Sequence, residues 1–313
     1  MNNSPLNPDG FLKPKAYFTS ARNAFEFLLK HLEFTENDKI LLPSYIGFTE
    51  REGSGVFDPV QNLNLNYIFY TVDKQLKLNI TEVEKLLQSE RIKVLLVIHY
   101  FGFCQNDIIE IKRLCKKQNV LLVEDCAHTM TSKVNGAYLG TFGDFAFNSI
   151  HKFLSTEIGG KLTINNNEYN YITNEKTNDL PDKKTFDLIL RSDYSKIHQK
   201  RRDNYLYLEN LLNGMPGFKF LYDNLPSGIS PHNFPVVIDN NLREPLYFDL
   251  IKNEIPVIAL YYRMIDIIKE KGFQDALLIS NSILNLPVHQ DITFSDLDKI
   301  ADQFLISIIN VSK

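Results

Sequence analysis

The sequence predicts an α/β protein with a mainly parallel sheet. Short apolar runs typical of buried strands alternate with amphipathic stretches typical of helices through the first half of the chain. Polar residues follow several of these runs directly, and open α/β sheets carry their functional groups at such strand ends. The Gly- and Pro-containing stretch 214–230 reads as a linker, so we expect a large domain at residues 1–213 and a small α+β domain at residues 214–313.

In chain order, Ser20 is a good N-cap for a first helix, because apolar residues follow it at helical spacing. Residues 165–184 are polar without a clear period and predict a loop-rich excursion. Residues 194–212 predict a long helix, whose basic cluster Lys200-Arg201-Arg202 is interpreted as a solvated face, with contact to a substrate phosphate as the alternative. The predicted strands are 39–42, 67–72, 94–98, 120–123, 144–150, 161–164, 234–238 and 255–259, and the other predicted helices are 81–87, 107–118, 242–253 and a C-terminal helix.

Composition narrows the classes of protein. The 313 residues carry a net charge of −4, which argues against nucleic acid or an acidic membrane as the main partner. Three cysteines without a CxxC motif indicate reduced thiols. The first ten residues lack the order of a signal peptide, and the apolar runs are too short to span a bilayer, so we expect a cytoplasmic protein.

Four motifs lie in a fixed order in the middle of the chain. They are Glu124-Asp125-Cys126-Ala127-His128, residues 140–144 (GTFGD), Ser149-Ile150-His151-Lys152 and Gly159-Gly160. Their order and spacing resemble the DegT/DnrJ/EryC1/StrS family of pyridoxal-phosphate (PLP) sugar aminotransferases. The resemblance implies the fold type I of PLP-dependent transferases, with a large domain around a seven-stranded, mainly parallel sheet.

The resemblance assigns the two central roles to Lys152 and Asp125. Lys152 is the lysine expected to form a Schiff base with PLP, although only two residues separate it from Ser149, where the commoner family pattern has four. Asp125 is expected beside the pyridine nitrogen, where a carboxylate keeps that nitrogen protonated. The alternative interpretations are a surface lysine in a loop and a carboxylate that caps a turn.

The remaining cofactor contacts follow from the same resemblance. Ser149 is the candidate phosphate donor, and His128 is expected near the ring oxygen or Asp125. Ser20, Ala21 and Arg22 open a helix whose free N–H groups suit a phosphate, with an ordinary capped helix as the alternative. Phe48 is the candidate for stacking on the ring and Tyr45 the second, and either residue is also compatible with a plain core position.

The resemblance implies an aminotransferase that moves an amino group from a donor such as glutamate to a keto sugar, nucleotide-linked, in the synthesis of surface polysaccharide or a related product. Tyr262 and Arg263, with Tyr45, are weak candidates for substrate contacts. A homodimer is also implied. The alternatives are a PLP enzyme that dehydrates a sugar or performs another elimination, and a binding or regulatory protein of the same fold.

Overall fold

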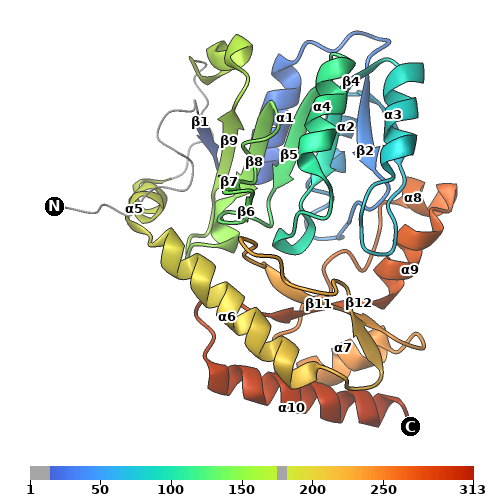
Figure 1. Cartoon of the computed structure of the whole chain (residues 1–313), viewed down its shortest axis with the longest axis vertical. Coiled ribbons are helices and arrows are strands. Elements are labelled where there is room, and N and C mark those ends of the chain that lie inside the picture. The colour runs from blue at the N-terminus through green and yellow to red at the C-terminus, as the bar shows by residue number, and fades with distance from the viewer. Residues whose placement is uncertain (1–14, 175–181) are drawn as a thin grey trace.

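The computed structural model describes residues 15–174 and 182–313. Its largest element is a seven-stranded sheet in the order β1-β9-β8-β5-β4-β2-β3, with helices over both faces (Figure 1). The neighbouring pairs among β8, β5, β4, β2 and β3 are parallel, whereas β9 runs antiparallel to β8 and β1. The strands are β1 Lys15–Phe18, β2 Lys39–Pro43, β3 Asn66–Tyr70, β4 Ile92–Ile98, β5 Leu121–Cys126, β8 Phe145–Ser149 and β9 Gly160–Ile164. The sheet agrees with the prediction.

Three helices of this half begin where a side-chain oxygen caps them. Ser20 caps α1, Asn79 caps α3 and Asp107 caps α4, each by accepting backbone N–H groups of the first turn. The helices are α1 Ala21–His31, α2 Phe57–Asn62, α3 Ile80–Ser89 and α4 Ile108–Lys117, and a short hairpin pairs β6 Lys133–Val134 with β7 Ala137–Tyr138.

The second half of the chain centres on a three-stranded antiparallel sheet, β10-β11-β12, formed by Phe218–Phe220, Asn233–Ile238 and Ile283–Pro287. α6 (Tyr194–Leu212) and α10 (Phe294–Val311) pack against each other beside it (Figure 1). The Tyr205 ring on α6 lies 4.5 Å from the Phe234 ring on β11, which joins the helix to the sheet. The other helices are α5 Lys183–Arg191, α7 Arg243–Lys252, α8 Asp266–Lys271 and α9 Gln274–Ser282.

Three local predictions differ from the structure. Residues 255–259 do not form a strand, because only Ile258 makes a bridge, to Asn285. The polar segment after β9 contains a 3₁₀ helix, Asn167–Asn174, and part of α5; its residues 175–181 lie outside the described ranges. Arg201 does not belong to a solvated face, because its side chain is fully buried. The division at residue 214 stays a prediction.

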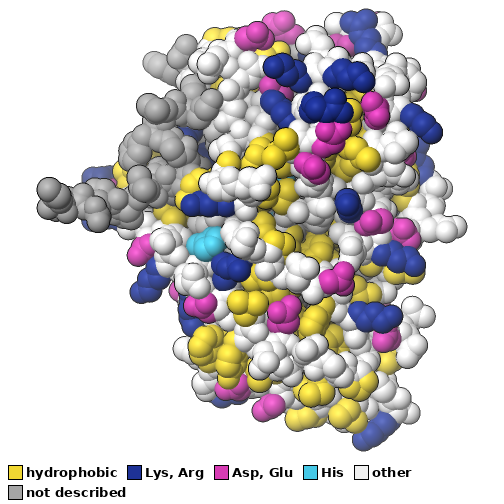
Figure 2. Space-filling model, viewed as in Figure 1, with side chains coloured by type: hydrophobic (Ala, Val, Ile, Leu, Met, Phe, Trp, Pro, Cys, Tyr) yellow, Lys and Arg dark blue, Asp and Glu magenta, His cyan; other side chains and the backbone are white. Residues whose placement is uncertain are grey.

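Within the described ranges, no helix combines the length and apolar character needed to cross a bilayer. On the face drawn in Figure 2, basic and acidic side chains are interspersed among small apolar areas. This mixture agrees with the small net charge of the sequence.

Candidate active site

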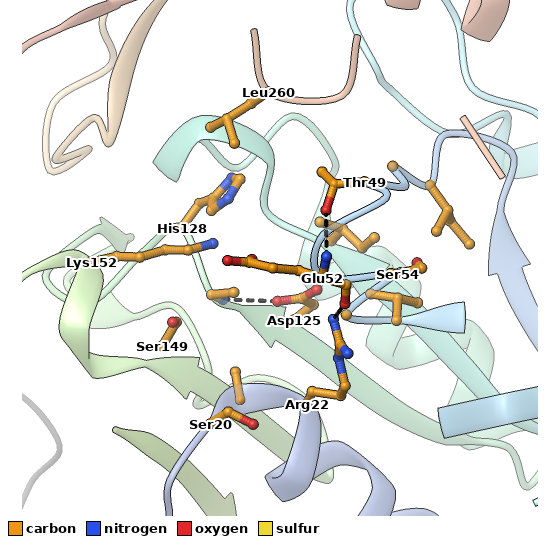
Figure 3. Close-up of a pocket in the computed structure, with 18 of the residues that line it drawn as sticks. Ser20, Arg22, Thr49, Glu52, Ser54, Asp125, His128, Ser149, Lys152 and Leu260 are labelled. Atoms are coloured by element: carbon orange, nitrogen blue, oxygen red, sulfur yellow. Dashed lines mark hydrogen bonds between the residues drawn. The ribbon is translucent and has the colours of Figure 1, made fainter. Parts of the chain in front are cut away.

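A cavity of about 540 Å³ opens at the edge of the seven-stranded sheet where β5 and β8 end (Figure 3). Because these strands are parallel, their carboxyl ends bring residues from distant parts of the chain to one edge. Segments 46–49 and 51–56 and residues Leu260 and Tyr261 form the opposite wall. Eight of the predicted site residues line this cavity: Ser20, Ala21, Arg22, Phe48, Asp125, His128, Ser149 and Lys152.

Asp125 lies at the end of β5, with only 4% of its surface exposed. Its Oδ1 accepts the N–H of Ala127 at 2.8 Å. Burial raises the pKa of Asp125 to about 6, against the lowering effects of that hydrogen bond and of the charges of Lys152 and His99. The carboxyl group is therefore held at the base of the cavity in an environment that favours a cationic neighbour.

Glu124 points away from the cavity and fastens the strand end. Its carboxylate accepts N–H groups of Gly140, Phe142 and Gly143 at 2.9, 2.8 and 2.6 Å, and its Oε2 lies 2.9 Å from Nε2 of His99. A side chain at Gly143 would lie 2.8 Å from the carbonyl oxygen of Leu122, so the turn before β8 requires glycine there. His99 is thus a buried, hydrogen-bonded residue that supports Glu124.

Lys152 ends a 3₁₀ turn, Ile150–Lys152, that directly follows β8. This tight turn explains how Ser149 and Lys152 line the same cavity although only two residues separate them. In Figure 3 the Lys152 side chain extends into the cavity between His128 and Ser149. Burial lowers the pKa of Lys152, and the carboxylates of Asp125 and Glu52 act in the opposite direction. A lowered pKa increases the fraction of a lysine that is present as the neutral, nucleophilic amine.

His128 follows β5 and faces Lys152. Its Nδ1 lies 3.3 Å from the N–H of Phe101, which makes Nδ1 an acceptor and leaves Nε2 as the donor. Burial and the nearby charge of Lys152 lower the pKa of His128 well below its usual range. The imidazole is thus a neutral ring with one N–H to offer inside the cavity.

The start of α1 forms the lower wall of the cavity. Ser20 accepts the N–H of Asn23 at 3.1 Å, and the N–H groups of Ala21 and Arg22 precede the first intrahelical bond. Gly160 permits this arrangement, because a side chain there would overlap the carbonyl group of Ser20. This helix start, with the Ser149 hydroxyl nearby in Figure 3, is suited to an anion.

The Arg22 side chain is directed elsewhere. It lies 3.3 Å from the carboxylate of Asp58 and donates to the carbonyl oxygen of Glu52. Arg22 therefore fastens the segment around Glu52 to the helix start, in addition to lining the cavity.

The structure does not bring the other predicted residues into the cavity lining. Tyr45 is fully buried and packs on Tyr261, with 5.2 Å between the ring centroids. The Tyr262 ring faces the Arg243 guanidinium at 5.5 Å, and Arg263 forms an ion pair with Glu50 at 2.7 Å. Tyr261, whose φ is 60°, lines the cavity, whereas the next two residues do not; the Arg263 guanidinium also lies 5.9 Å from the centroid of the Phe48 ring. Their substrate roles stay predictions.

Glu52 and Tyr261 also line the cavity, and Glu52 was not among the predicted residues. Figure 3 shows Glu52 reaching across the cavity toward Lys152. The sequence around Glu52 reads EGSG, and such a Gly-rich loop with charges is a recognised place for ligand contacts. That signal was available, whereas nothing local to Tyr261 indicated that it pairs with residues more than 200 positions earlier.

Comparison with known proteins gives a consistent result. The family model for the DegT/DnrJ/EryC1/StrS aminotransferase family matches residues 15–176. GDP-perosamine synthase of Escherichia coli O157:H7 is 27% identical over 158 residues, which are 48% of this chain and 40% of that protein. The chain thus matches less than half of this relative's length.

Solved structures extend the likeness to nearly the whole chain. PseC of Helicobacter pylori, an aminotransferase involved in the biosynthesis of pseudoaminic acid, superposes with a TM-score of 0.78 at 18% identity, over 95% of this chain and 87% of that one. The putative sugar aminotransferase Spr1654 of Streptococcus pneumoniae, in its PLP form, superposes with a TM-score of 0.77 at 18% identity, over 95% of this chain and 87% of that one. The predicted fold is confirmed. With the family model covering more than half of its residues, the chain belongs to the DegT/DnrJ/EryC1/StrS aminotransferase family, whose enzymes depend on PLP.

Proposed function

We propose that this protein is a PLP-dependent aminotransferase that moves an amino group from a donor such as glutamate to a nucleotide-linked keto sugar. The observation that carries the proposal is the presence of a buried carboxyl group, Asp125, and a lysine of lowered pKa, Lys152, in one cavity. This pair is what an enzyme needs to hold a pyridine ring and attack its aldehyde. A protein that had lost catalysis would have no need for both.

The donors in the cavity fit PLP by their chemistry. Asp125 offers a carboxylate to a ring nitrogen, and the buried Lys152 offers an amine to an aldehyde. The start of α1, with Ser20 and Ala21, and the hydroxyl of Ser149 would hold the phosphate. His128 offers one N–H beside Lys152 for the ring oxygen, and Phe48 offers an aromatic surface.

Each residue then has a defined task. When bound, PLP supplies a ring that withdraws electrons from the amino-bearing carbon of the substrate. Asp125 would favour a proton on the ring nitrogen, because a buried carboxylate gains from a cationic neighbour. The Lys152 amine, lying in the same cavity, would take up a proton and give it back as a general base and acid.

Three further parts of the proposal rest on the family. The acceptor is a nucleotide-linked sugar, as for the E. coli relative whose name is GDP-perosamine synthase. The product would serve a surface polysaccharide or a related compound. A homodimer would complete the site, and a light-scattering mass equal to one chain at micromolar concentration would count against it.

A two-stage absorbance experiment tests the activity. Purified protein is loaded with PLP, and glutamate is added without acceptor. We expect the absorbance of the lysine-bound cofactor to be replaced by that of its aminated form. After removal of glutamate, a panel of nucleotide-linked keto sugars should restore the first spectrum, with the amino sugar identified by mass spectrometry.

The control is the same protein with glutarate, which has no amino group to give. Absence of any change with a range of amino donors would overturn the aminotransferase assignment. Loss of water from the sugar without reoxidation of the aminated cofactor would indicate the elimination chemistry instead.

A further inference from the structure

Arg201 is a buried arginine that forms no ion pair with any carboxylate among the described residues. It lies on α6, and none of its surface is exposed. Burial lowers the pKa of Arg201 to about 9, with Asp291 acting weakly in the opposite direction. A buried cation without a partner carboxylate is unfavourable unless its N–H groups are well used. The hydrogen bonds of Arg201 therefore indicate what it is for.

Those hydrogen bonds converge on the backbone that carries the catalytic lysine. Nη2 of Arg201 donates to the carbonyl oxygen of Lys152 at 3.0 Å. Nε donates to Oε1 of Gln290 at 2.7 Å, and Nε2 of Gln290 donates to the carbonyl oxygen of Phe153 at 2.7 Å. Because an arginine can only donate, the orientation of the Gln290 amide is fixed by this contact. Two successive carbonyl groups, those of Lys152 and Phe153, are thus held by one linked pair of side chains.

The Phe153 ring adds a second contact to this pair. The guanidinium of Arg201 lies 4.6 Å from the centroid of that ring, at the distance of a cation–π interaction. On its other side the same turn is fixed by Ile150, whose N–H donates to the carbonyl of Gly159 at 2.8 Å. The backbone of Lys152 is consequently fastened both to the large sheet and to the segment that follows β12.

A second branch from Arg201 reaches the wall of the cavity. Nη1 donates to the carbonyl oxygen of His232 at 3.2 Å. The His232 ring stacks on His128, with 4.8 Å between centroids, and the N–H of His232 donates to the carbonyl of Phe101 at 2.7 Å. Both residues beside the proposed cofactor position, Lys152 and His128, are therefore supported by Arg201.

We propose that Arg201 and Gln290 are positioning residues for Lys152: they hold its backbone so that the side chain enters the cavity in the direction that covalent attachment of the cofactor requires. This inference rests on the proposed function, in which Lys152 is the residue that binds the cofactor. It concerns the placement of a reactive group, and a displacement of about 1 Å at such a group is enough to slow a reaction by roughly a hundredfold.

The test uses Arg201→Lys, Gln290→Leu and the matched control Arg202→Lys. Arg202 is the next residue on α6 and also donates to backbone carbonyls, those of Pro226 and Ile229 at 2.8 and 2.5 Å, but it does not touch the Lys152 turn. Arg201→Lys keeps the charge without the fork of donors. Gln290→Leu replaces a half-buried side chain by one of similar size. If Arg201→Lys does not fold, this second variant still tests the proposal.

The first readout needs no cofactor. Trace reductive methylation with formaldehyde and cyanoborohydride is followed at Lys152 by peptide mass mapping across pH. Arg201→Lys and Gln290→Leu, here called the clamp variants, weaken the hydrogen bonds that hold the backbone of Lys152. The Lys152 amine can then leave the cavity for water, so the pH midpoint of its reactivity should move up toward that of a solvated lysine in both clamp variants. Arg202→Lys should keep the wild-type midpoint.

The second readout is the rate of covalent attachment of added PLP, which should fall roughly tenfold or more in both clamp variants and less than twofold in the control. If the clamp variants melt at lower temperature but keep the control's midpoint and rate, Arg201 serves only the fold and the proposal is overturned. Failure of the wild-type protein to bind PLP would count against the proposed function alone, because the methylation profiles still decide the positioning role.

Discussion

The two walls of the cavity are built in different ways. The sheet wall consists of strand ends and a helix start, where Asp125 and Ser149 complete ladder-paired strands and Ser20 packs against Gly160. The opposite wall consists of two loops that hold each other. The N–H of Phe48 donates to the carbonyl of Arg263 at 2.9 Å, and the N–H of Ile265 donates to that of Ile46 at 3.1 Å.

This difference has a chemical consequence. The sheet wall carries the groups that a cofactor needs to find in fixed positions, because its backbone is tied into the seven-stranded sheet. The loop wall carries Glu52, Tyr261 and Phe48, and its segments do not belong to the seven-stranded sheet, so we expect it to adjust more readily to what enters the cavity. We therefore expect attachment of the cofactor to depend mainly on the sheet wall, and the rate of attachment and the choice of substrate to be adjusted by the loop wall.

The largest expected effect is at Lys152. Lys152→Ala should lose all cofactor that borohydride can trap, because no other amine of the sheet wall lines the cavity in the described part of the chain. Peptide mapping of the reduced wild-type protein should place the pyridoxyl group on Lys152. Lys200→Ala, a surface lysine that lies over the Phe294 ring, is the control and should trap normally. An adduct on Lys161, the nearest alternative in the sequence, would remove the central assignment.

The next effect concerns Asp125, the other fixed group. Asp125→Asn should keep the fold and lower the rate of the glutamate half-reaction by roughly 10²–10³, since an amide cannot hold the proton on the ring nitrogen. Single-turnover absorbance measures this loss. A half-reaction near the wild-type rate would show that the carboxylate is not needed there.

The same variant should change stability in a pH-dependent way. The pKa of Asp125 rises from 3.8 to about 6 on folding, so this group lowers stability progressively as pH rises from about 4 to 6, and by a constant amount above that range. Asp125→Asn removes the charge. It should be more stable than cofactor-free wild type at pH 8 by on the order of 2–3 kcal/mol and lose that advantage near pH 4. Urea unfolding at the two pH values measures the difference in free energy of unfolding between the variant and the wild type.

The two walls also differ in how far the sequence predicted them. Asp125 and Ser149 were identified from the resemblance to the family. The apolar runs that precede them predict strands, and parallel pairing brings the ends of these strands together. In the loop wall, Phe48 was predicted from the resemblance, but the pairing of the two loops was not. That pairing depends on a bridge between Gly47 and Met264 that no local pattern indicates. Arg201 was misjudged for a related reason. Its neighbours Lys200 and Arg202 suggested a solvated basic face, and only tertiary packing distinguishes the buried member of the cluster.

A pair of glycine substitutions compares the rigidity of the walls directly. A side chain at Gly160 would collide with backbone atoms of Ser20 and Ala21, which cannot move without disturbing α1. Gly160→Ala should therefore destabilise the protein by roughly 3 kcal/mol or more. A side chain at Gly47 would lie 2.8 Å from Cδ1 of the Tyr261 ring, which is a side-chain atom and not backbone, so Gly47→Ala should cost less, about 1–2 kcal/mol. Equal losses in urea unfolding would contradict the proposed difference between the walls.

The smallest effect is expected at Glu52, the acidic side chain of the loop wall that faces Lys152 in Figure 3. Burial lowers the pKa of Lys152, and the charge of Glu52 partly offsets that shift. Glu52→Gln should therefore lower this pKa further and increase the neutral fraction of the amine at pH 7. The rate of PLP attachment should rise roughly twofold to fivefold, the size expected for one partly solvated charge.

Glu50→Gln is the matched control for this prediction. Glu50 belongs to the same loop, but its carboxylate pairs with Arg263 at 2.7 Å and does not line the cavity. Its replacement should leave the attachment rate unchanged and remove only an exposed ion pair. If both glutamine variants accelerate attachment equally, the effect comes from the net charge of the loop. If only Glu52→Gln does so, and its advantage over wild type disappears at a pH where Lys152 is already neutral, the loop wall acts on the lysine through this one carboxylate.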